Sequence, residues 1–113
     1  MDLTPAVRAG LQLVERYGGG RFKVGGVVHE GAVLVCADRT IALPAEADIP
    51  ACLAGVEVLL WGCGERMRPV PAERRAALKA IGVVVEPMDT GAAARTYNVL
   101  VMEGRRVAAV LEV

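Results

Sequence analysis

An Asp-Thr-Gly triplet at Asp89–Gly91 could support chemistry, because aspartic proteases carry their catalytic carboxylate in the same three residues. In a protease assembled from two short chains, the triplet belongs early in the sequence, on a loop that lets two aspartates share a proton. Here it lies near the end of a 113-residue sequence and is followed by three alanines, Ala92 to Ala94, which favour a helix. We therefore predict that the triplet begins a helix and is not catalytic.

The residues after this triplet have the spacing of an amphipathic helix that ends near Gly104. Asp89 or Thr90 should cap the first turn, with a side-chain oxygen accepting an otherwise unpaired backbone N–H. The side predicted to face the core consists of Ala92, Ala93, Thr96, Tyr97, Val99 and Leu100.

Three residues of this helix, Arg95, Asn98 and Met102, fall on the side predicted to face outward. Polar residues beside an exposed methionine suit contact with another protein. An ordinary solvated helix face is the alternative interpretation.

A second candidate is Gly62-Cys63-Gly64, which follows a buried apolar run just as the triplet does. Ligands tend to bind at the carboxyl ends of parallel strands, so neighbouring strands would bring the two segments together. The residues expected to line the resulting crevice are Gly62, Gly64, Asp89, Thr90 and Arg95. Backbone N–H groups near Gly91 would hold a small anion with help from Arg95. The alternative is a tight structural turn beside a helix cap, because two glycines fall short of a phosphate-binding fingerprint.

Cys63 would act as a nucleophile only beside a base, and nothing in the sequence brings the sole histidine, His29, close to it. Cys36, Cys52 and Cys63 form neither an even disulfide set nor a Cys-x-x-Cys motif, so we expect reduced thiols. One histidine with scattered cysteines makes no zinc site. We predict no metal and no cofactor.

Glycine pairs and short polar turns divide residues 11–43 into segments rich in β-branched and aromatic residues, which predicts an antiparallel meander. Gly25-Gly26 should form a two-residue hairpin turn, because glycine adopts positive φ without steric cost. The predicted strands are the segments RFKV, VVH, AVLVCA and TIAL.

Beyond these strands, helices and strands alternate, which predicts crossover connections and a partly parallel sheet. Residues 45–55 should hold one or two helical turns, and a clearer helix has Pro71 near its first turn and Gly82 as its stop. Two buried strands are predicted in VEVLLW and VVVEPM. Arg74 falls on the apolar side of the clearer helix, where its head either extends to water or joins a buried ion pair.

Length, composition and charge limit the classes of function. A sequence of 113 residues with 54% hydrophobic composition predicts one ordered domain, residues 1–113. Thirteen Lys plus Arg balance thirteen Asp plus Glu, so no long-range field favours nucleic acid. Residues 1–20 lack the uninterrupted apolar core of a secretory signal, and no segment is long enough to span a membrane. We expect a cytoplasmic protein that binds no nucleic acid.

The stretches WGCGERMRPVP and ALKAIGVVVEPMDTGAAARTYNVLVMEGRRVAAVLEV resemble the Mth938-type domain of unknown function. The mitochondrial members of that family include an assembly factor of respiratory complex I. The motifs that carry the resemblance are the Gly-x-Gly of Gly62 and Gly64, the runs Asp89–Ala93 and Arg95–Asn98, and the turn Glu103–Arg106. The resemblance extends from about Gly20 to the end of the sequence and implies a three-layer α/β fold around a central mixed sheet.

Two departures from the family pattern stand out. Arg74 stands where the relatives are expected to have an apolar helix residue, and we expect no mitochondrial presequence, which suggests a bacterial relative. For such a relative the mitochondrial role is an analogy.

We expect a non-enzymatic protein-binding or assembly module. By resemblance, its partner would belong to respiratory complex I or to membrane-protein biogenesis, and a homo-oligomer is also compatible with the sequence. The expected ligand or partner surface consists of Trp61, Gly62, Gly64, Asp89, Thr90, Gly91, Arg95 and Asn98. The alternative is a small enzyme or an anion- or metabolite-binding protein that uses the crevice at Gly62, Gly64, Asp89 and Arg95.

Overall fold

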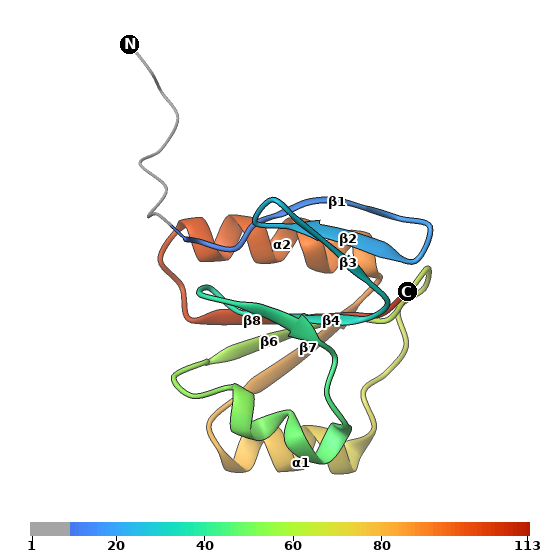
Figure 1. The fold of residues 1–113 in the computed structure, drawn as a ribbon. Coiled ribbons are helices and arrows are strands. Elements are labelled where there is room, and N and C mark those ends of the chain that lie inside the picture. The colour runs from blue at the N-terminus through green and yellow to red at the C-terminus, as the bar shows by residue number, and fades with distance from the viewer. Residues whose placement is uncertain (1–9) are drawn as a thin grey trace.

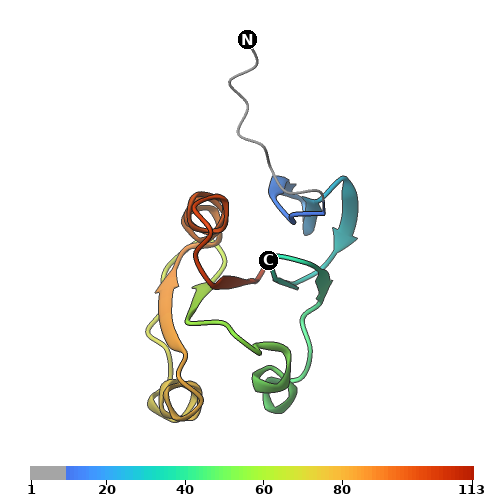
Figure 2. The same ribbon diagram turned by 90° about the vertical axis from the view of Figure 1, so that its left-hand side faces the viewer.

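The computed structural model describes residues 10–113, whose helices and strands form three layers (Figures 1 and 2). A five-stranded sheet is the middle layer. Helix α2 (Thr90–Met102) and a three-stranded sheet cover one of its faces, while helix α1 (Ala72–Ala80) and two short 3₁₀ helices cover the other. The predicted α/β architecture with a central mixed sheet and flanking helices is confirmed. Residues 1–9, which hold part of the segment compared above with secretory signals, lie outside the described residues.

The amino-terminal strands β1 (Val14–Gly18), β2 (Arg21–Val24) and β3 (Val27–Glu30) form an antiparallel sheet in that order. Gly25 and Gly26 join β2 to β3 with φ values of 56° and 82°, so the predicted glycine hairpin is confirmed. β1 was not among the predicted strands. Its last four residues are all exposed, so it lacks the apolar alternation by which a half-buried strand is identified.

The five-stranded sheet has the order β5-β4-β8-β6-β7. Its strands are β4 (Val33–Val35), β5 (Thr40–Ala42), β6 (Val58–Gly62), β7 (Val84–Met88) and β8 (Val107–Leu111). β6 pairs in parallel with β7 and β8, whereas β4 pairs antiparallel with β5 and β8. The predicted meander therefore divides between two sheets, because the three buried residues of β4 are covered on both faces in the middle layer.

Burial follows the position of each strand in this sheet. All five residues of the central strand β8 are buried. The strand predicted in VVVEPM is β7, but its expected full burial was wrong, because it forms the edge of the sheet and Val84 is 54% exposed while Val85 is buried. α2 packs mainly over β6 and β8. The burial of β7 was mispredicted because an apolar run in a sequence does not reveal which elements will cover that strand.

The helices begin and end close to their predicted positions. α1 starts directly after Pro71 and stops before Gly82, whose φ is 81°, and α2 stops shortly before Gly104. The helical turns expected within residues 45–55 are the 3₁₀ helices η1 (Glu46–Asp48) and η2 (Pro50–Cys52). No helix within residues 10–113 is long and apolar enough to cross a lipid bilayer.

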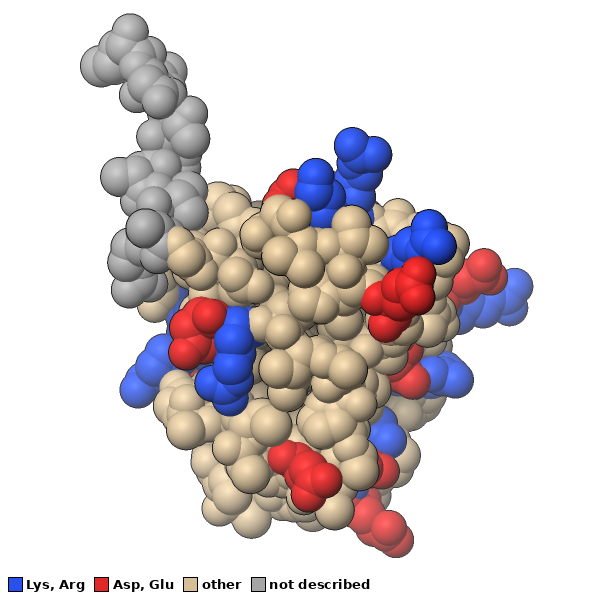
Figure 3. All heavy atoms as spheres, in the orientation of Figure 1, with Lys and Arg blue, Asp and Glu red and all other residues tan. Residues whose placement is uncertain are grey.

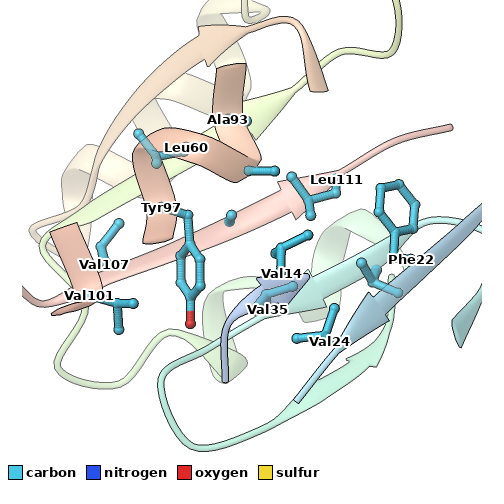
Figure 4. Close-up of a cluster of buried hydrophobic side chains, with 13 residues drawn as sticks. Val14, Phe22, Val24, Val35, Leu60, Ala93, Tyr97, Val101, Val107 and Leu111 are labelled. Atoms are coloured by element: carbon cyan, nitrogen blue, oxygen red, sulfur yellow. The ribbon is translucent and has the colours of Figure 1, made fainter. Parts of the chain in front are cut away.

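Each face of the five-stranded sheet carries its own cluster of buried side chains. The cluster beneath α2 and the three-stranded sheet contains Phe22, Tyr97 and Leu111 (Figure 4). The Tyr97 hydroxyl donates a hydrogen bond to the Gln12 carbonyl at 2.8 Å, so this buried phenol is satisfied. Burial raises the pKa of Tyr97 above the ordinary range of tyrosine.

Arg74 connects α1 to η1 across the other face of the sheet. Its guanidinium carbon lies 4.0 Å from the centre of the Trp61 ring, and its Nε pairs with the Glu46 carboxylate. The Arg74 side chain is 23% exposed, whereas that of Glu46 is 61% exposed, so Arg74 forms an ion pair at the surface, neither a head free in water nor a buried pair. The hydrogen bond from Arg74 lowers the pKa of the Glu46 carboxyl.

Candidate functional site

The carboxyl ends of β6 and β7 meet at one end of the five-stranded sheet, because the two strands run parallel and Gly62 pairs with Met88. α2 begins directly after β7, so its amino terminus lies at the same end. The two strands are therefore neighbours, which was the arrangement expected to bring the Gly62–Gly64 segment and the Asp-Thr-Gly triplet together.

The β1–β2 hairpin lies beside this end of the sheet (Figure 1), and the two enclose a cleft of about 460 Å³, which we name the hairpin crevice. Its lining consists of the hairpin residues 17–22, Gly64 and Glu65 after β6, Asp89–Gly91 at the start of α2, and Glu112 and Val113 after β8. The ends of β6 and β7 and the start of α2 were predicted from the sequence, but the hairpin and the residues after β8 were not.

Asp89 caps α2. Its Oδ1 accepts a hydrogen bond from the Ala92 N–H at 2.8 Å, and its extended backbone is typical of an N-cap residue. The Asp-Thr-Gly triplet thus begins a helix, which confirms the prediction made in place of a protease site.

Thr90 joins the ends of three elements. Its hydroxyl accepts a hydrogen bond from the Gly64 N–H at 2.8 Å and donates one to the Glu112 carbonyl at 2.7 Å. The Thr90 N–H also donates to the Gly64 carbonyl at 2.8 Å. Thr90 is 5% exposed, so these bonds hold β6, β8 and α2 together in a place that water hardly reaches.

The two glycines of the Gly-x-Gly motif are required by packing and by the turn. A Cβ at Gly62 would lie 2.9 Å from the Thr90 Cα, a backbone atom that cannot move away cheaply. Gly64 has a φ of 88°, which disfavours any other residue. Gly62 does not line the hairpin crevice, so for Gly62 the structure favours close packing over a ligand cradle, whereas Gly64 forms the turn and also lines the crevice.

Tyr17 is the most prominent crevice residue that the sequence analysis missed. A Cβ at Gly91 would lie 2.3 Å from the Tyr17 hydroxyl oxygen and 3.3 Å from an Arg95 guanidinium nitrogen. The Tyr17 ring stacks against Phe22 with the centroids 6.5 Å apart, and half of Tyr17 is exposed. Arg95 therefore lies at the rim of the crevice, beside Tyr17 and Gly91. An aromatic residue directly before a glycine triplet was the available signal for this hairpin.

Asn98 does not face solvent as predicted. Its side-chain amide accepts a hydrogen bond from the Val14 N–H at 2.9 Å and donates one to the Val14 carbonyl at 2.8 Å. In a helical wheel, a polar side chain that binds a strand edge cannot be told from one that faces water. The wheel also failed at Val99, which was assigned to the core side but is 53% exposed.

Trp61 lies on the α1 face of the sheet and is 4% exposed, so it is not part of an accessible partner surface. Its Nε1 donates a hydrogen bond to the Glu112 carboxylate at 2.8 Å. Cys63 is also buried, and its thiol lies within hydrogen-bond distance of two backbone carbonyls. His29 pairs with Phe22 in the three-stranded sheet, away from the strand that leads into Cys63.

The other thiols and acids provide no metal site within residues 10–113, where no three His, Cys, Asp or Glu side chains cluster suitably. Cys36 is buried, and burial raises the pKa of its thiol. A buried thiol with a raised pKa is a weak nucleophile.

Residues 14–112 match the family described as a protein of unknown function, DUF498/DUF598. The chain belongs to this family. An uncharacterised protein of Rhodobacter capsulatus is 42% identical over 106 residues, which cover 91% of this chain and 86% of that protein.

Solved structures also resemble this DUF498/DUF598 protein. A Bordetella pertussis protein described as a Mth938-like domain has a TM-score of 0.79 and 32% identity, covering 99% of this chain and 92% of the other. A Bartonella henselae protein described as an outer membrane protein has a TM-score of 0.83 and 32% identity, covering 91% and 95%. The predicted family and the Mth938-like fold are both confirmed for this DUF498/DUF598 protein.

Proposed function

We propose that this protein is a non-enzymatic module that binds a protein partner through the hairpin crevice and its rim. The observation that supports this proposal is that three polar residues of the crevice wall are already bonded within the fold. Asp89 caps α2, Thr90 joins three elements, and Glu112 accepts hydrogen bonds from Trp61 and Arg68.

A catalytic acid or base needs freedom to exchange a proton with a substrate. When a group in a helix cap or a buried junction gives up its hydrogen bond to exchange a proton, the fold loses stability. The wall of the crevice is therefore better suited to presenting a fixed shape than to catalysis.

The accessible rim has the composition of a protein contact. Tyr17 offers a half-exposed aromatic ring, while Arg95 and Glu65 offer exposed charges of opposite sign. Tyrosine and arginine are enriched at protein interfaces and often dominate their binding energy. An extended segment of a partner that inserts one side chain into the crevice would contact all three.

The resemblance to the Mth938-type family suggests the class of partner. We propose a subunit of a respiratory NADH:quinone oxidoreductase or of the membrane-protein biogenesis machinery, met at the cytoplasmic side of the membrane. A relative is described as an outer membrane protein. Cell fractionation of the tagged chain would therefore test the proposed compartment alongside the partner.

The direct test compares proteins captured by the tagged wild-type chain and by variants, using mass spectrometry of native-host extracts. Arg95→Glu and Glu65→Lys alter the crevice rim, and both residues are exposed, so the fold should tolerate the changes. Arg105→Glu is the matched control, because it makes the same charge change on an exposed arginine beyond the other end of α2.

We expect specific subunits that are retained by the wild type and by Arg105→Glu, and lost with either rim variant. An identical set of proteins from all four chains would overturn the crevice as the binding surface.

A small-molecule site is the second candidate, because a cleft of about 460 Å³ falls within the size range of ligand pockets. In this alternative the Gly91 backbone and Arg95 would contact an anionic metabolite. A small molecule that copurifies with the wild type, and is lost with Arg95→Glu while no protein partner appears, would favour this candidate.

A further inference from the structure

Sheet edges present unpaired backbone N–H and C=O groups, which pair with other chains unless something covers or interrupts them. The edge strands in the described part of the chain are β1, β3, β5 and β7. β1 has an irregular register beside Val14, and the Asn98 amide bonds both backbone groups of Val14. β7 contains Pro87, and Arg75 donates to the Val85 carbonyl at 3.2 Å. β5 is only three residues long.

β3 has none of these protections. It pairs with β2 in an unbroken register, contains no proline, and no side chain from residues 10–113 hydrogen-bonds its backbone. The Gly31 N–H donates to the Gly20 carbonyl at 2.8 Å, so Gly20 and Gly31 are a hydrogen-bonded pair that continues the β2–β3 ladder. Because bonded and non-bonded pairs alternate along an antiparallel ladder, the backbone groups of His29 face β2. Those of Val28 and Glu30 face the open edge.

The first two residues of this edge are apolar and exposed, since Val27 and Val28 are 57% and 58% exposed, and they are followed by His29 and the exposed Glu30. The edges β3 and β5 lie on the same side of the molecule (Figure 2), which is the side facing the viewer in Figure 1. Figure 3 shows that the middle of this side is uncharged, with acidic and basic side chains around its margins. A surface of this kind can meet its own copy without repulsion between like charges.

We propose that β3 pairs antiparallel with β3 of a second copy of this chain, joining the two three-stranded sheets into one continuous sheet across a twofold axis. The open backbone groups of Val28 set the register. Each Val28 would exchange both backbone hydrogen bonds with Val28 of the second copy, so the two valine side chains pack against each other. In the same register Glu30 lies opposite Gly26 of the second copy, and no acidic pair is formed.

The twofold axis of this pairing runs perpendicular to the joined sheets, so it also brings together the uncharged sides that carry β5. This second contact matters because pairing of two four-residue strands alone buries less than the roughly 1,200 Å² of a standard stable interface. We therefore expect a reversible dimer that forms as concentration rises. The proposal does not rest on the hairpin crevice, and the rim variants Arg95→Glu and Glu65→Lys should leave the dimer unchanged.

The test is sedimentation equilibrium of the wild type from about 10 µM to about 1 mM, the range in which weak interfaces assemble. The average mass should rise from 11.9 kDa towards twice that value. Val28→Pro removes an N–H that the hairpin does not use, so it should keep the fold and hold the mass at that of the monomer. Hydrogen exchange on the wild type should show the Val28 and Glu30 amides slowing as concentration rises.

Val28→Lys and Val84→Lys form a matched pair, because both valines are more than half exposed on edge strands and only Val28 lies on β3. Val28→Lys should give a monomer, and Val84→Lys should dimerise like the wild type. A wild-type chain that stays monomeric across the whole range overturns the proposal, as does a dimer that survives both substitutions at Val28.

Discussion

At the scale of single residues, the first turn of α2 depends on the Asp89 carboxylate, which accepts the Ala92 N–H. Asp89→Ala should cost about 1 kcal/mol and lower the melting temperature by roughly 4–8 °C, because the capping hydrogen bond is lost. Asp89→Asn should retain most of the stability, since asparagine caps helices as well as aspartate does. Thermal denaturation followed by circular dichroism measures both. An unchanged melting temperature together with lost partner binding would instead indicate a functional carboxylate.

Thr90 should be more sensitive to substitution than its neighbour. Thr90→Val keeps the shape of the side chain but leaves the Gly64 N–H and the Glu112 carbonyl without their hydroxyl partner. Each unsatisfied buried group costs about 1–3 kcal/mol, so the midpoint of urea unfolding should fall clearly. Thr90→Ser retains the hydroxyl and should lose much less. Equal stability of the two variants would mean that this junction is not an important source of stability.

At the scale of elements, β1 is held from both sides, by β2 in its sheet and by Asn98 from α2. Asn98→Ala should release the outer side of β1 while leaving α2 intact. Hydrogen exchange at the Val14 amide should therefore accelerate, with α2 amides largely unaffected. Slow exchange at Val14 in the variant would show that the β1–β2 pairing alone protects this strand.

The link between α1 and η1 should depend on pH. Arg74 lowers the pKa of Glu46, so this pair stabilises the fold fully above 4.5, the ordinary glutamate value. The stabilisation is lost as pH falls through the lowered pKa. Trp61 is the sole tryptophan and lies under Arg74, so its fluorescence should change as the pair breaks, with a midpoint below 4.5. Glu46→Gln should lack this transition, and a transition that persists in the variant would assign it to another group.

At the scale of the whole molecule, local signals in the sequence were sufficient for most elements. Proline, glycine and alanine positions located both α-helices, and the glycine pair located the β2–β3 turn. These features depend on backbone preferences within a few residues of each other, which a sequence displays directly. The α/β class followed from the alternation of the elements.

Features that depend on contacts between distant segments could not be predicted in the same way. Tyr17 lies beside Gly91, and Asn98 binds Val14, although the residues of each pair are far apart in the chain. The edge position of β7 likewise depends on how distant strands are ordered in the sheet. The hairpin side of the crevice was missed for this reason. The part that was predicted consists of residues beside strand ends, which parallel topology brings together by a general rule.

The central position of β8 also has a consequence for biosynthesis. β8 separates β4 from β6, and its pairing joins Val33 to Leu111, which lie far apart in the sequence. During translation, β4 and β6 leave the ribosome long before the strand that must lie between them. Their apolar faces therefore need protection by chaperones or by transient collapse, and closure of the sheet should be slow, as in other folds dominated by distant pairings.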